Sequence, residues 1–263
     1  MKRDYTFYIP LLFTILVCAF LVIPVAMSVL AGLTNNYFVG VKSGLTFRWV
    51  IEVWELYSQT LWLTLFIALA AVVVNLVVGV PLAYYLAAQR SRLTEMLQEL
   101  ITLPIAVPGL AISIGLITTY GHFSTFRSSW AFILVGHVVF TLPFMVNAIL
   151  AALNSINFKV LEEGAASLGA GFWRRFVDII VPNCITGIVS GTLMTLTLSI
   201  GEFNLTWMLH TPLTKTLPVG LADAYASMRL EIGSAYTLIF LLLLLPLLVA
   251  TQLIKRNSNK GAM

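Results

Sequence analysis

The residues of this sequence best suited to contact another molecule form one polar interruption near its middle. The small residues in it allow a close approach to the backbone, and its leucines offer apolar contact. Its acidic and basic pairs have opposite charge, which can fix the orientation of a partner. The pattern therefore predicts a surface that docks another protein. The interruption consists of Leu161, Glu162, Glu163, Gly164, Ala165, Ala166, Ser167, Leu168, Gly169 and Ala170, followed by Phe172, Trp173, Arg174, Arg175 and Phe176.

The same stretch carries the signals of two short helices joined by a turn. Asn157 is an acceptable N-cap for the first helix, and Gly169 can adopt the left-handed conformation that ends it. A second helix can start near Gly171 and continue toward Pro182, whose ring should force Val181 out of helical geometry. We therefore expect a helix, a glycine turn and a second helix.

No other motif in the sequence supplies the chemistry of an enzyme. The sequence contains no Gly-x-x-x-x-Gly-Lys-Ser/Thr nucleotide loop, no HExxH pair and no His/Cys cluster with metal-ligand spacing. A Ser-Lys hydrolase needs a lysine near a serine at the membrane face, and the nearest candidate, Lys215 between Thr214 and Thr216, lies in a predicted outer loop. We expect no catalytic residue, no metal site and no cofactor.

The composition is that of a protein in a lipid bilayer. Of the 263 residues, 59% are apolar or aromatic and only 10% are charged. The net charge of +4 comes from short segments between apolar stretches, without an aromatic-interleaved basic patch, so it does not predict a nucleic-acid partner. Cys18 and Cys184 are expected in different parts of the molecule, so no disulfide is predicted.

Six apolar segments are long enough to cross a bilayer, whose hydrocarbon core of roughly 30 Å needs about 20 helical residues. They cover residues 9–30, 57–88, 100–120, 130–153, 184–209 and 232–254. The sequence therefore predicts an all-α polytopic membrane protein with about six transmembrane helices. A cleaved signal peptide is the alternative for the first segment, but its apolar core should contain only about 7 to 15 residues.

Glycine and proline interrupt two of the segments. Gly79 and Pro81 should break the second segment. The third contains Pro104 and Pro108, which remove backbone donors and kink the helix, leaving carbonyl groups that need partners in protein or in a water-lined path. The two prolines therefore either line a pathway or create a kink that helps packing.

Polar and small residues in the fourth and fifth segments predict contacts between helices or a role in a pathway across the membrane. His137 could relay protons, but a lone histidine within a membrane span more often hydrogen-bonds a neighbouring helix. Gly187 and Gly191, four residues apart, allow another helix to approach closely. Glu202 follows Pro182 by about 30 Å of helix, near the outer interface. There it either lines a pathway or gate, or hydrogen-bonds and anchors the helix end.

The loops and their basic residues predict the orientation in the membrane. Residues 34–55, 121–128 and 210–231 are expected outside, the last with a short surface helix over residues 221–230. This layout puts ten Lys and Arg residues inside and five outside, so both termini and the docking stretch are expected in the cytoplasm. The ten are Lys2, Arg3, Arg90, Arg92, Lys159, Arg174, Arg175, Lys255, Arg256 and Lys260, and the five are Lys42, Arg48, Arg127, Lys215 and Arg229.

The docking stretch resembles the "EAA" coupling loop of ABC importer permeases, whose pattern is Glu-Ala-Ala, three residues, Gly and a later Pro. Gly replaces the first Ala at position 164, and Thr186 stands where many members have a second Pro. A later stretch, Ser199, Gly201, Glu202 and Phe203, resembles permeases for polyamines, sulfate, molybdate, iron(III) and aminoethylphosphonate. The residues that match the loop are Glu163, Gly164, Ala165, Gly169, Phe176, Ile179 and Pro182.

The resemblance implies a type I ABC importer permease: a single transmembrane domain over residues 1–263 with a cytoplasmic coupling loop at about 154–183. It further implies that a second permease subunit completes the pore, that cytoplasmic ATPase subunits bind the coupling loop, and that a periplasmic binding protein delivers substrate, all at the bacterial inner membrane. The implied ATPase-coupling residues are Glu162, Glu163, Gly164, Ala165, Ala166, Leu168, Gly169 and Ala170, supported by Phe176, Ile179 and Pro182, with Glu202, Pro104 and Pro108 as pathway or gate candidates.

Two questions stay open at the level of sequence. An ion-coupled secondary transporter or channel is the alternative function, but it should contain inverted repeats with broken helices and charges at the membrane midplane. A purely structural membrane protein would leave the coupling motif unexplained. The substrate is expected to be a small polar solute of the polyamine or aminoethylphosphonate type, and Glu202 with the few outer acidic residues slightly favours a cationic polyamine.

Overall fold

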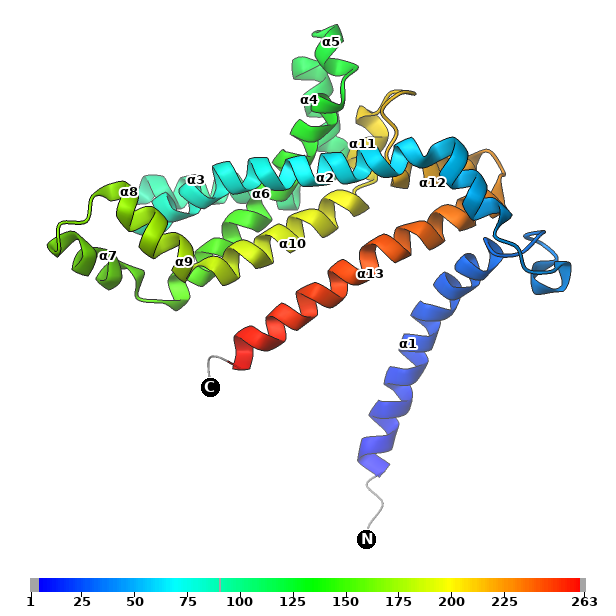
Figure 1. The fold of residues 1–263 in the computed structure, drawn as a ribbon, viewed down its shortest axis with the longest axis horizontal. Helices are drawn as coiled ribbons and strands as arrows, with labels where there is room; N and C mark the ends of the chain where they lie inside the picture. The colour runs from blue at the N-terminus through cyan, green and yellow to red at the C-terminus, as the bar shows by residue number, and fades with distance from the viewer. Residues whose placement is uncertain (1–4, 90, 261–263) are drawn as a thin grey trace. The chain divides into compact units, whose positions relative to one another are not determined.

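The computed structural model describes residues 5–89 and 91–260, and nearly all of them are helical (Figure 1). Within these residues the only β pairing is an isolated bridge between Thr34 and Leu45, which confirms the all-α prediction. The helices are α1 (Tyr5–Ala31), α2 (Arg48–Ala88), α3 (Arg92–Ala106), α4 (Gly109–Tyr120), α5 (Ser124–Arg127), α6 (Trp130–Ser155), α7 (Phe158–Ser167), α8 (Phe172–Arg175), α9 (Val181–Asn183), α10 (Ile185–Gly201), α11 (Asn204–Leu209), α12 (Leu217–Ala226) and α13 (Leu230–Lys260), with a 3₁₀ turn η1 (Gly40–Ser43) and a π turn η2 (Phe176–Ile180).

Four described helices, α1, α2, α6 and α13, are long and apolar enough to cross a membrane by themselves. Two further helix pairs pass the same test together but are strongly bent. The pair α3 and α4 is bent by 108°, and the helical run 172–183 is bent by 70° from α10. Counting each bent pair as one span, the described residues contain up to six, as the sequence predicts.

The interruptions differ from those expected at two of the predicted segments. Helix α2 continues unbroken through Gly79 and Pro81, so the predicted break there is wrong. A Cβ atom at Gly79 would lie 3.1 Å from the Met145 side chain, so this glycine admits α6 instead of ending the helix. The third predicted span is broken at Val107, which is extended, while Pro104 stays inside α3. The short surface helix expected at 221–230 corresponds to α12, which begins four residues earlier and whose first four residues are buried, contrary to the surface position expected.

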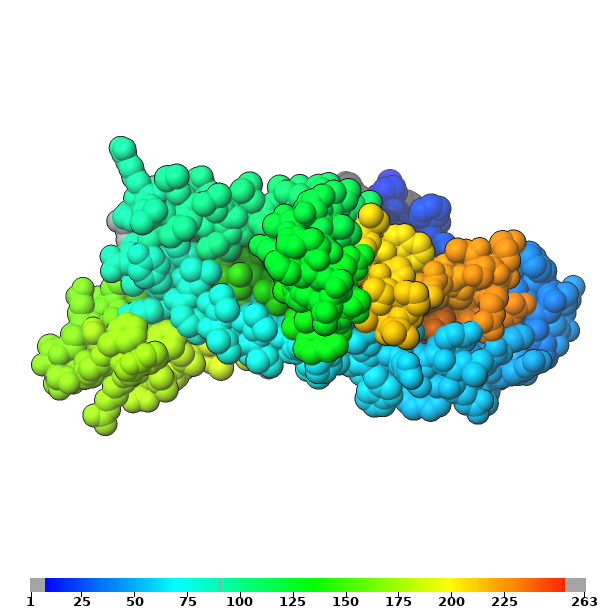
Figure 2. Space-filling view, turned by 90° about the horizontal axis from the view of Figure 1, so that it is seen from above, coloured from blue at the N-terminus to red at the C-terminus, as the bar shows by residue number. Residues whose placement is uncertain are grey.

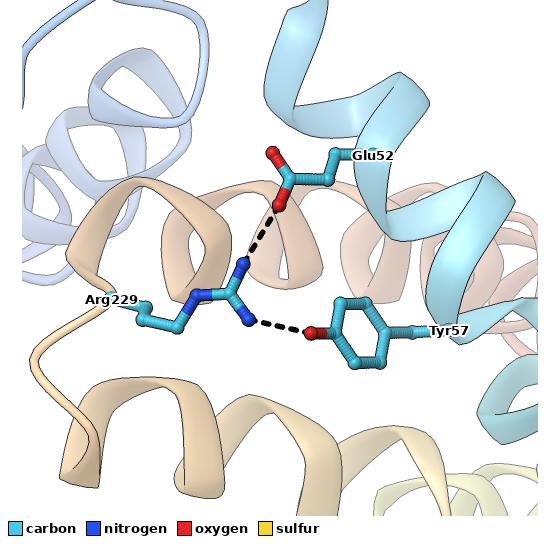
Figure 3. A network of polar contacts seen from close by, with 3 residues as sticks. All are labelled: Glu52, Tyr57 and Arg229. Atoms are coloured by element: carbon cyan, nitrogen blue, oxygen red, sulfur yellow. Dashed lines mark hydrogen bonds and ion pairs between the residues drawn. The ribbon is translucent and has the colours of Figure 1, made fainter.

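Contacts divide the chain into two compact units, and residues 1–58 with 220–242 form the first. Here the Arg229 guanidinium donates to the Tyr57 hydroxyl (2.5 Å) and pairs with the Glu52 carboxylate (2.7 Å), as Figure 3 shows. The Glu231 carboxylate accepts the backbone N–H of Tyr37 at 2.9 Å. These bonds tie the residue before α13 to the first turns of α2, and the first turn of α13 to the loop after α1. Lys2, Arg3 and Arg90, which enter the predicted orientation, lie outside the described residues.

The second unit, residues 59–219 with 243–263, has α6 and α10 packed against each other along much of their length (Figure 1). A Cβ atom at Gly187 would lie 2.6 Å from Ala152 Cβ and 2.7 Å from the Ala148 carbonyl oxygen. A Cβ atom at Gly191 would lie 2.6 Å from Met145 Sδ. The prediction that this glycine pair admits a neighbouring helix is confirmed, and the neighbour is α6.

Candidate functional site

The docking stretch folds into a helical hairpin that lies between α6 and α10 in the chain and projects from one end of the second unit (Figure 2). Helix α7 starts after Asn157, although the Asn157 side chain makes no capping hydrogen bond. Gly169 has φ +84°, the left-handed conformation predicted for it. The N–H of Gly169 donates to Ala166 and the N–H of Ala170 to Ala165, so two backbone bonds close the helix end as a Schellman motif.

The second half of the hairpin is helical for longer than expected. Val181 has φ −59° and ψ −49°, so the prediction that Pro182 forces it out of helical geometry is wrong. The turn η2 widens to π geometry, and the Val181 N–H donates to the carbonyl of Phe176, five residues back. A wider turn before a proline accommodates both its missing donor and its ring, so the helix continues. The chain bends only at Cys184.

One face of the hairpin is open to contact. Leu168, at the tip, is 90% exposed, and Glu163 on α7 is exposed as well. A Cβ atom at either Gly164 or Gly169 would have no neighbouring atom within 4 Å. Neither glycine is therefore required by packing within the chain, and both leave the backbone of the hairpin accessible from outside. Ala166 is exposed, whereas Ala165 and Ala170 are half-buried.

The acidic and basic pairs do not form two separate surface patches, contrary to the sequence interpretation. The Glu162 carboxylate turns inward, where it pairs with Arg175 at 3.3 Å. It also accepts a hydrogen bond from the Tyr84 hydroxyl at 2.5 Å. Arg174 remains exposed and lies 3.7 Å from Asp178 on the next turn. Glu162 and Arg175 thus hold the hairpin together, and Glu163 and Arg174 remain on its surface.

Aromatic rings support the hairpin from inside. The Tyr84 ring lies 6.5 Å from that of Phe158, 6.2 Å from Phe172 and 5.4 Å from Phe176. Of the predicted supporting residues, Phe176 packs against the core near α2, Ile179 is half-buried, and Pro182 is exposed. Tyr84 was not singled out by the sequence, because it is 78 residues from Glu162 and no spacing pattern links them.

A second notable region is formed where two helix breaks meet. Glu202 ends α10, and its carboxylate accepts the N–H of Leu205 at 2.7 Å, which caps α11. A Cβ atom at Gly109, directly after the break between α3 and α4, would lie 3.3 Å from the Glu202 carboxylate. The Ser113 hydroxyl on α4 donates to the Leu205 carbonyl at 3.1 Å. The break at Pro108 and the break at Glu202 therefore lie side by side.

His137 on α6 is buried and joins both sides of the break between α10 and α11. One ring nitrogen lies 2.7 Å from the Ser199 hydroxyl and the other 2.8 Å from the Thr206 hydroxyl. This arrangement agrees with the more common of the two sequence interpretations, hydrogen bonding to neighbouring helices. Its partners lie 62 and 69 residues away, beyond what a sequence pattern can indicate.

Comparison with known proteins shows relatives along most of the chain. A sequence profile of the family described as "Binding-protein-dependent transport system inner membrane component" matches residues 79–261. The molybdate/tungstate transport system permease protein WtpB of Thermococcus kodakarensis is 30% identical over 202 residues, 77% of each chain. The molybdenum transport system permease protein ModB of Escherichia coli is 29% identical over 192 residues, 67% of this chain and 83% of that protein. The putative 2-aminoethylphosphonate transport system permease protein PhnV of Salmonella typhimurium is 24% identical over 254 residues, 94% of each chain.

Solved structures share the fold. A chain of a bacterial alginate ABC transporter, crystallised in complex with an alginate pentasaccharide-bound periplasmic protein, aligns with a TM-score of 0.70 and 19% identity, covering 98% of this chain and 96% of that one. A chain of the MetNI methionine ABC transporter in an inward-facing conformation aligns with a TM-score of 0.65 and 16% identity, covering 78% and 97%. At such identities the likeness shows a shared architecture.

Proposed function

This chain belongs to the family of binding-protein-dependent transport system inner membrane components, and from this premise we propose how its residues carry out import. It is a multi-pass permease subunit of an ABC importer with the type I permease fold. In our proposal residues 1–263 act as one transmembrane permease domain that forms half of the translocation pore. A second permease subunit, the same or different, forms the other half.

The exposed face of the hairpin is the proposed docking surface for a cytoplasmic ATPase subunit. The observation that carries this proposal is an exposed apolar side chain at the tip of the hairpin: Leu168 is 90% exposed. It lies where α7 ends in the turn at Gly169, which has φ +84°. Glu163, Gly164 and Ala166 are exposed beside it, so a partner can reach the backbone of α7. ATP binding by the partner would then move the hairpin, and the attached helices would alternate between inward-open and outward-open states.

The test is co-purification of this chain from detergent-solubilised membranes. The cells should also express the ATPase, permease and binding-protein subunits of the same transport system. We expect an ATPase to be recovered with this chain and the complex to show vanadate-sensitive ATP hydrolysis, whereas the chain alone hydrolyses no ATP. Failure of any ATPase to associate would remove the coupling proposal and bring forward an ion-coupled secondary transporter. The helix breaks at Pro108 and Glu202 would then be its first candidate site.

We propose that the paired breaks form a gate of the translocation path, with Pro108 opening α4 and Glu202 holding the end of α10. Backbone that leaves helical geometry at membrane depth is tolerated where protein covers it or where it lines a cavity. The Glu202 carboxylate is occupied as the cap of α11, which argues for a positioning role. Pro104 lies one turn before the break, inside α3.

Two substitutions of Glu202 distinguish positioning from substrate contact. Glu202→Gln keeps an oxygen that can accept the Leu205 N–H, so we expect transport close to that of the unmodified chain. Glu202→Ala removes the acceptor at a cost of about 0.5–2 kcal/mol, and we expect a clear loss of uptake. The readout is the initial uptake rate in proteoliposomes of the full complex. Equal losses in both variants would assign the Glu202 charge to the substrate instead.

The relatives favour an oxyanion as substrate over the polyamine suggested by the outer acidic residues. The relatives named above are permeases for molybdate, tungstate or 2-aminoethylphosphonate, and each aligns with at least two thirds of this chain. Because the one acidic side chain at the paired breaks caps a helix, it does not require a cationic substrate. We therefore propose a small oxyanion of the molybdate or phosphonate type, delivered by a periplasmic binding protein.

Uptake by cells with and without this chain tests the substrate directly. We expect uptake of labelled molybdate or 2-aminoethylphosphonate to depend on the chain, and uptake of labelled putrescine to be unaffected. Dependence of putrescine uptake on the chain would contradict the oxyanion proposal and leave the permease assignment intact.

For the orientation in the membrane, we propose cytoplasmic termini and a cytoplasmic hairpin, because this layout puts the excess of Lys and Arg residues on the cytoplasmic side.

A further inference from the structure

The inward-facing side of the hairpin contains a contact that the docking surface does not explain. A single carboxylate oxygen, Glu162 Oε1, accepts the Tyr84 hydroxyl at 2.5 Å and lies 3.3 Å from Arg175 Nη1. Tyr84 is near the end of α2, Glu162 is on α7, and Arg175 is on α8. Three helices therefore meet at one atom, and α2 is the only one of them outside the hairpin.

Burial makes this junction stronger than an ordinary surface ion pair. The side chains of Arg175 and Glu162 are only 24% and 17% exposed. Partly buried charges are screened less by salt than exposed ones, and hydrogen bonds to an ionised acceptor are stronger than those between neutral groups. The Arg175 Nε atom is buried without a hydrogen-bond partner among the described residues, and Glu162 supplies a counter-charge at Nη1 of the same guanidinium.

The surrounding rings hold Tyr84 in place and prevent it from swinging away. The rings of Phe158, Phe172 and Phe176 lie within 6.5 Å of the Tyr84 ring, measured between centroids. Phe158 is buried and belongs to the same apolar core as the last turns of α2. The phenol hydroxyl is thus presented to Glu162 from a fixed position, which gives the contact a defined direction.

The junction lies beside apolar contacts between α2 and the hairpin, which Phe158 and Phe176 make. A cavity of about 530 Å³ lies beside it, lined by Tyr84 and Glu162 and, from α2 and α7, by Pro81, Tyr85 and Lys159. The Tyr84 hydroxyl provides a polar connection between the hairpin and the end of α2.

We propose that Tyr84, Glu162 and Arg175 form a clamp that transmits movement of the hairpin to α2. This inference rests on the proposed ATPase docking. It assigns different roles to the two adjacent glutamates of α7. Glu163 is exposed and available to the partner, whereas Glu162 is a positioning residue that is bonded to α2. Loss of the clamp would leave the ATPase bound and active but would allow the hairpin to move without α2.

The test uses the full transport complex in proteoliposomes and measures substrate imported per ATP hydrolysed. Tyr84→Phe removes only the hydroxyl, so we expect this ratio to fall about tenfold, with co-purification of the ATPase unchanged. Tyr85→Phe is the matched control, because it makes the same change one residue away and should leave the ratio unaltered. An unchanged ratio in Tyr84→Phe would overturn the clamp.

Charge reversal provides a second test that a purely structural role would not pass. Glu162→Arg and Arg175→Glu should each lower the ratio. The double reversal restores the ion pair within the hairpin but removes the carboxylate that accepts the Tyr84 hydroxyl, so we expect the ratio to stay low. Full recovery in the double variant, with both single variants inserted and bound to the ATPase, would contradict the proposal, because the ion pair alone would then be sufficient. Loss of ATPase binding in Glu162→Gln would show instead that Glu162 contacts the partner. If the unmodified chain binds no ATPase, the docking proposal itself has failed.

Discussion

Replacement of Gly169 by Trp is expected to abolish recovery of the ATPase and transport while the permease still inserts and folds. Gly169 has φ +84°, and a Cβ atom there would meet nothing within 4 Å. The cost to the fold is therefore the backbone strain alone, about 1–2 kcal/mol for a residue other than glycine in this conformation. An indole at the hairpin tip would instead collide with a partner seated against Leu168. The loss should appear in co-purification and in vanadate-sensitive ATP hydrolysis.

The matched control is Gly169→Asn, because asparagine tolerates the left-handed conformation and adds little bulk. It should retain most of the ATPase binding. Gly164→Ala is a second control, since it fills open space with the residue that the coupling motif has at this position. Normal ATPase recovery with Gly169→Trp would place the docking surface elsewhere on the chain.

Replacement of Gly187 by Leu is expected to prevent correct packing of α6 against α10. The first added carbon would already lie 2.6 Å from Ala152 Cβ and 2.7 Å from the Ala148 carbonyl oxygen. One of these neighbours is backbone and the other is a methyl group fixed to it, so neither can rotate away. Overpacking of a tight interface typically costs about 1–3 kcal/mol, and a branched side chain at this distance should reach the upper end.

The measurement is the fraction of monodisperse protein after detergent extraction, together with its melting temperature. Gly115→Leu is the control, because Gly115 also lies inside a membrane helix but a Cβ atom added there would have nothing within 4 Å. We expect Gly187→Leu to aggregate or melt several degrees lower and Gly115→Leu to behave as the unmodified chain. Equal melting temperatures for the two variants would show that α6 and α10 can separate at little cost.

Local signals in the sequence predicted the helical class, the approximate spans and the turn of the hairpin. Gly169 illustrates why: a left-handed helix end is a property of a few consecutive residues, and glycine is the residue that adopts it without strain. The glycine pair at 187 and 191 was similarly informative, because its spacing places both residues on one face of a helix. Such features depend on neighbours in the chain.

Features that depend on distant contacts were missed or misread. Pro81 looked like a helix break, but α2 continues through it, with α6 packed beside Gly79. Glu162 looked like part of a surface patch, but its partner Tyr84 is 78 residues away. The prolines predicted an irregular third span, but they did not predict its bend of 108° or the packing of α4 against α11. No periodicity encodes these pairings, so only the three-dimensional structure places them.

The position of the hairpin within the chain has a consequence for the order of folding. Helices α6 and α10 flank the hairpin directly, and their contacting residues Ala152 and Gly187 are separated by only 35 positions. By comparison, the hydrogen bond from Leu217 to Thr64 closes a separation of 153 positions. Contacts between near neighbours in sequence form faster, because less chain entropy is lost. We expect the α6–α10 pair and its hairpin to be assembled while α12 and α13 are still being synthesised, so a nascent chain would already display the proposed ATPase-docking surface.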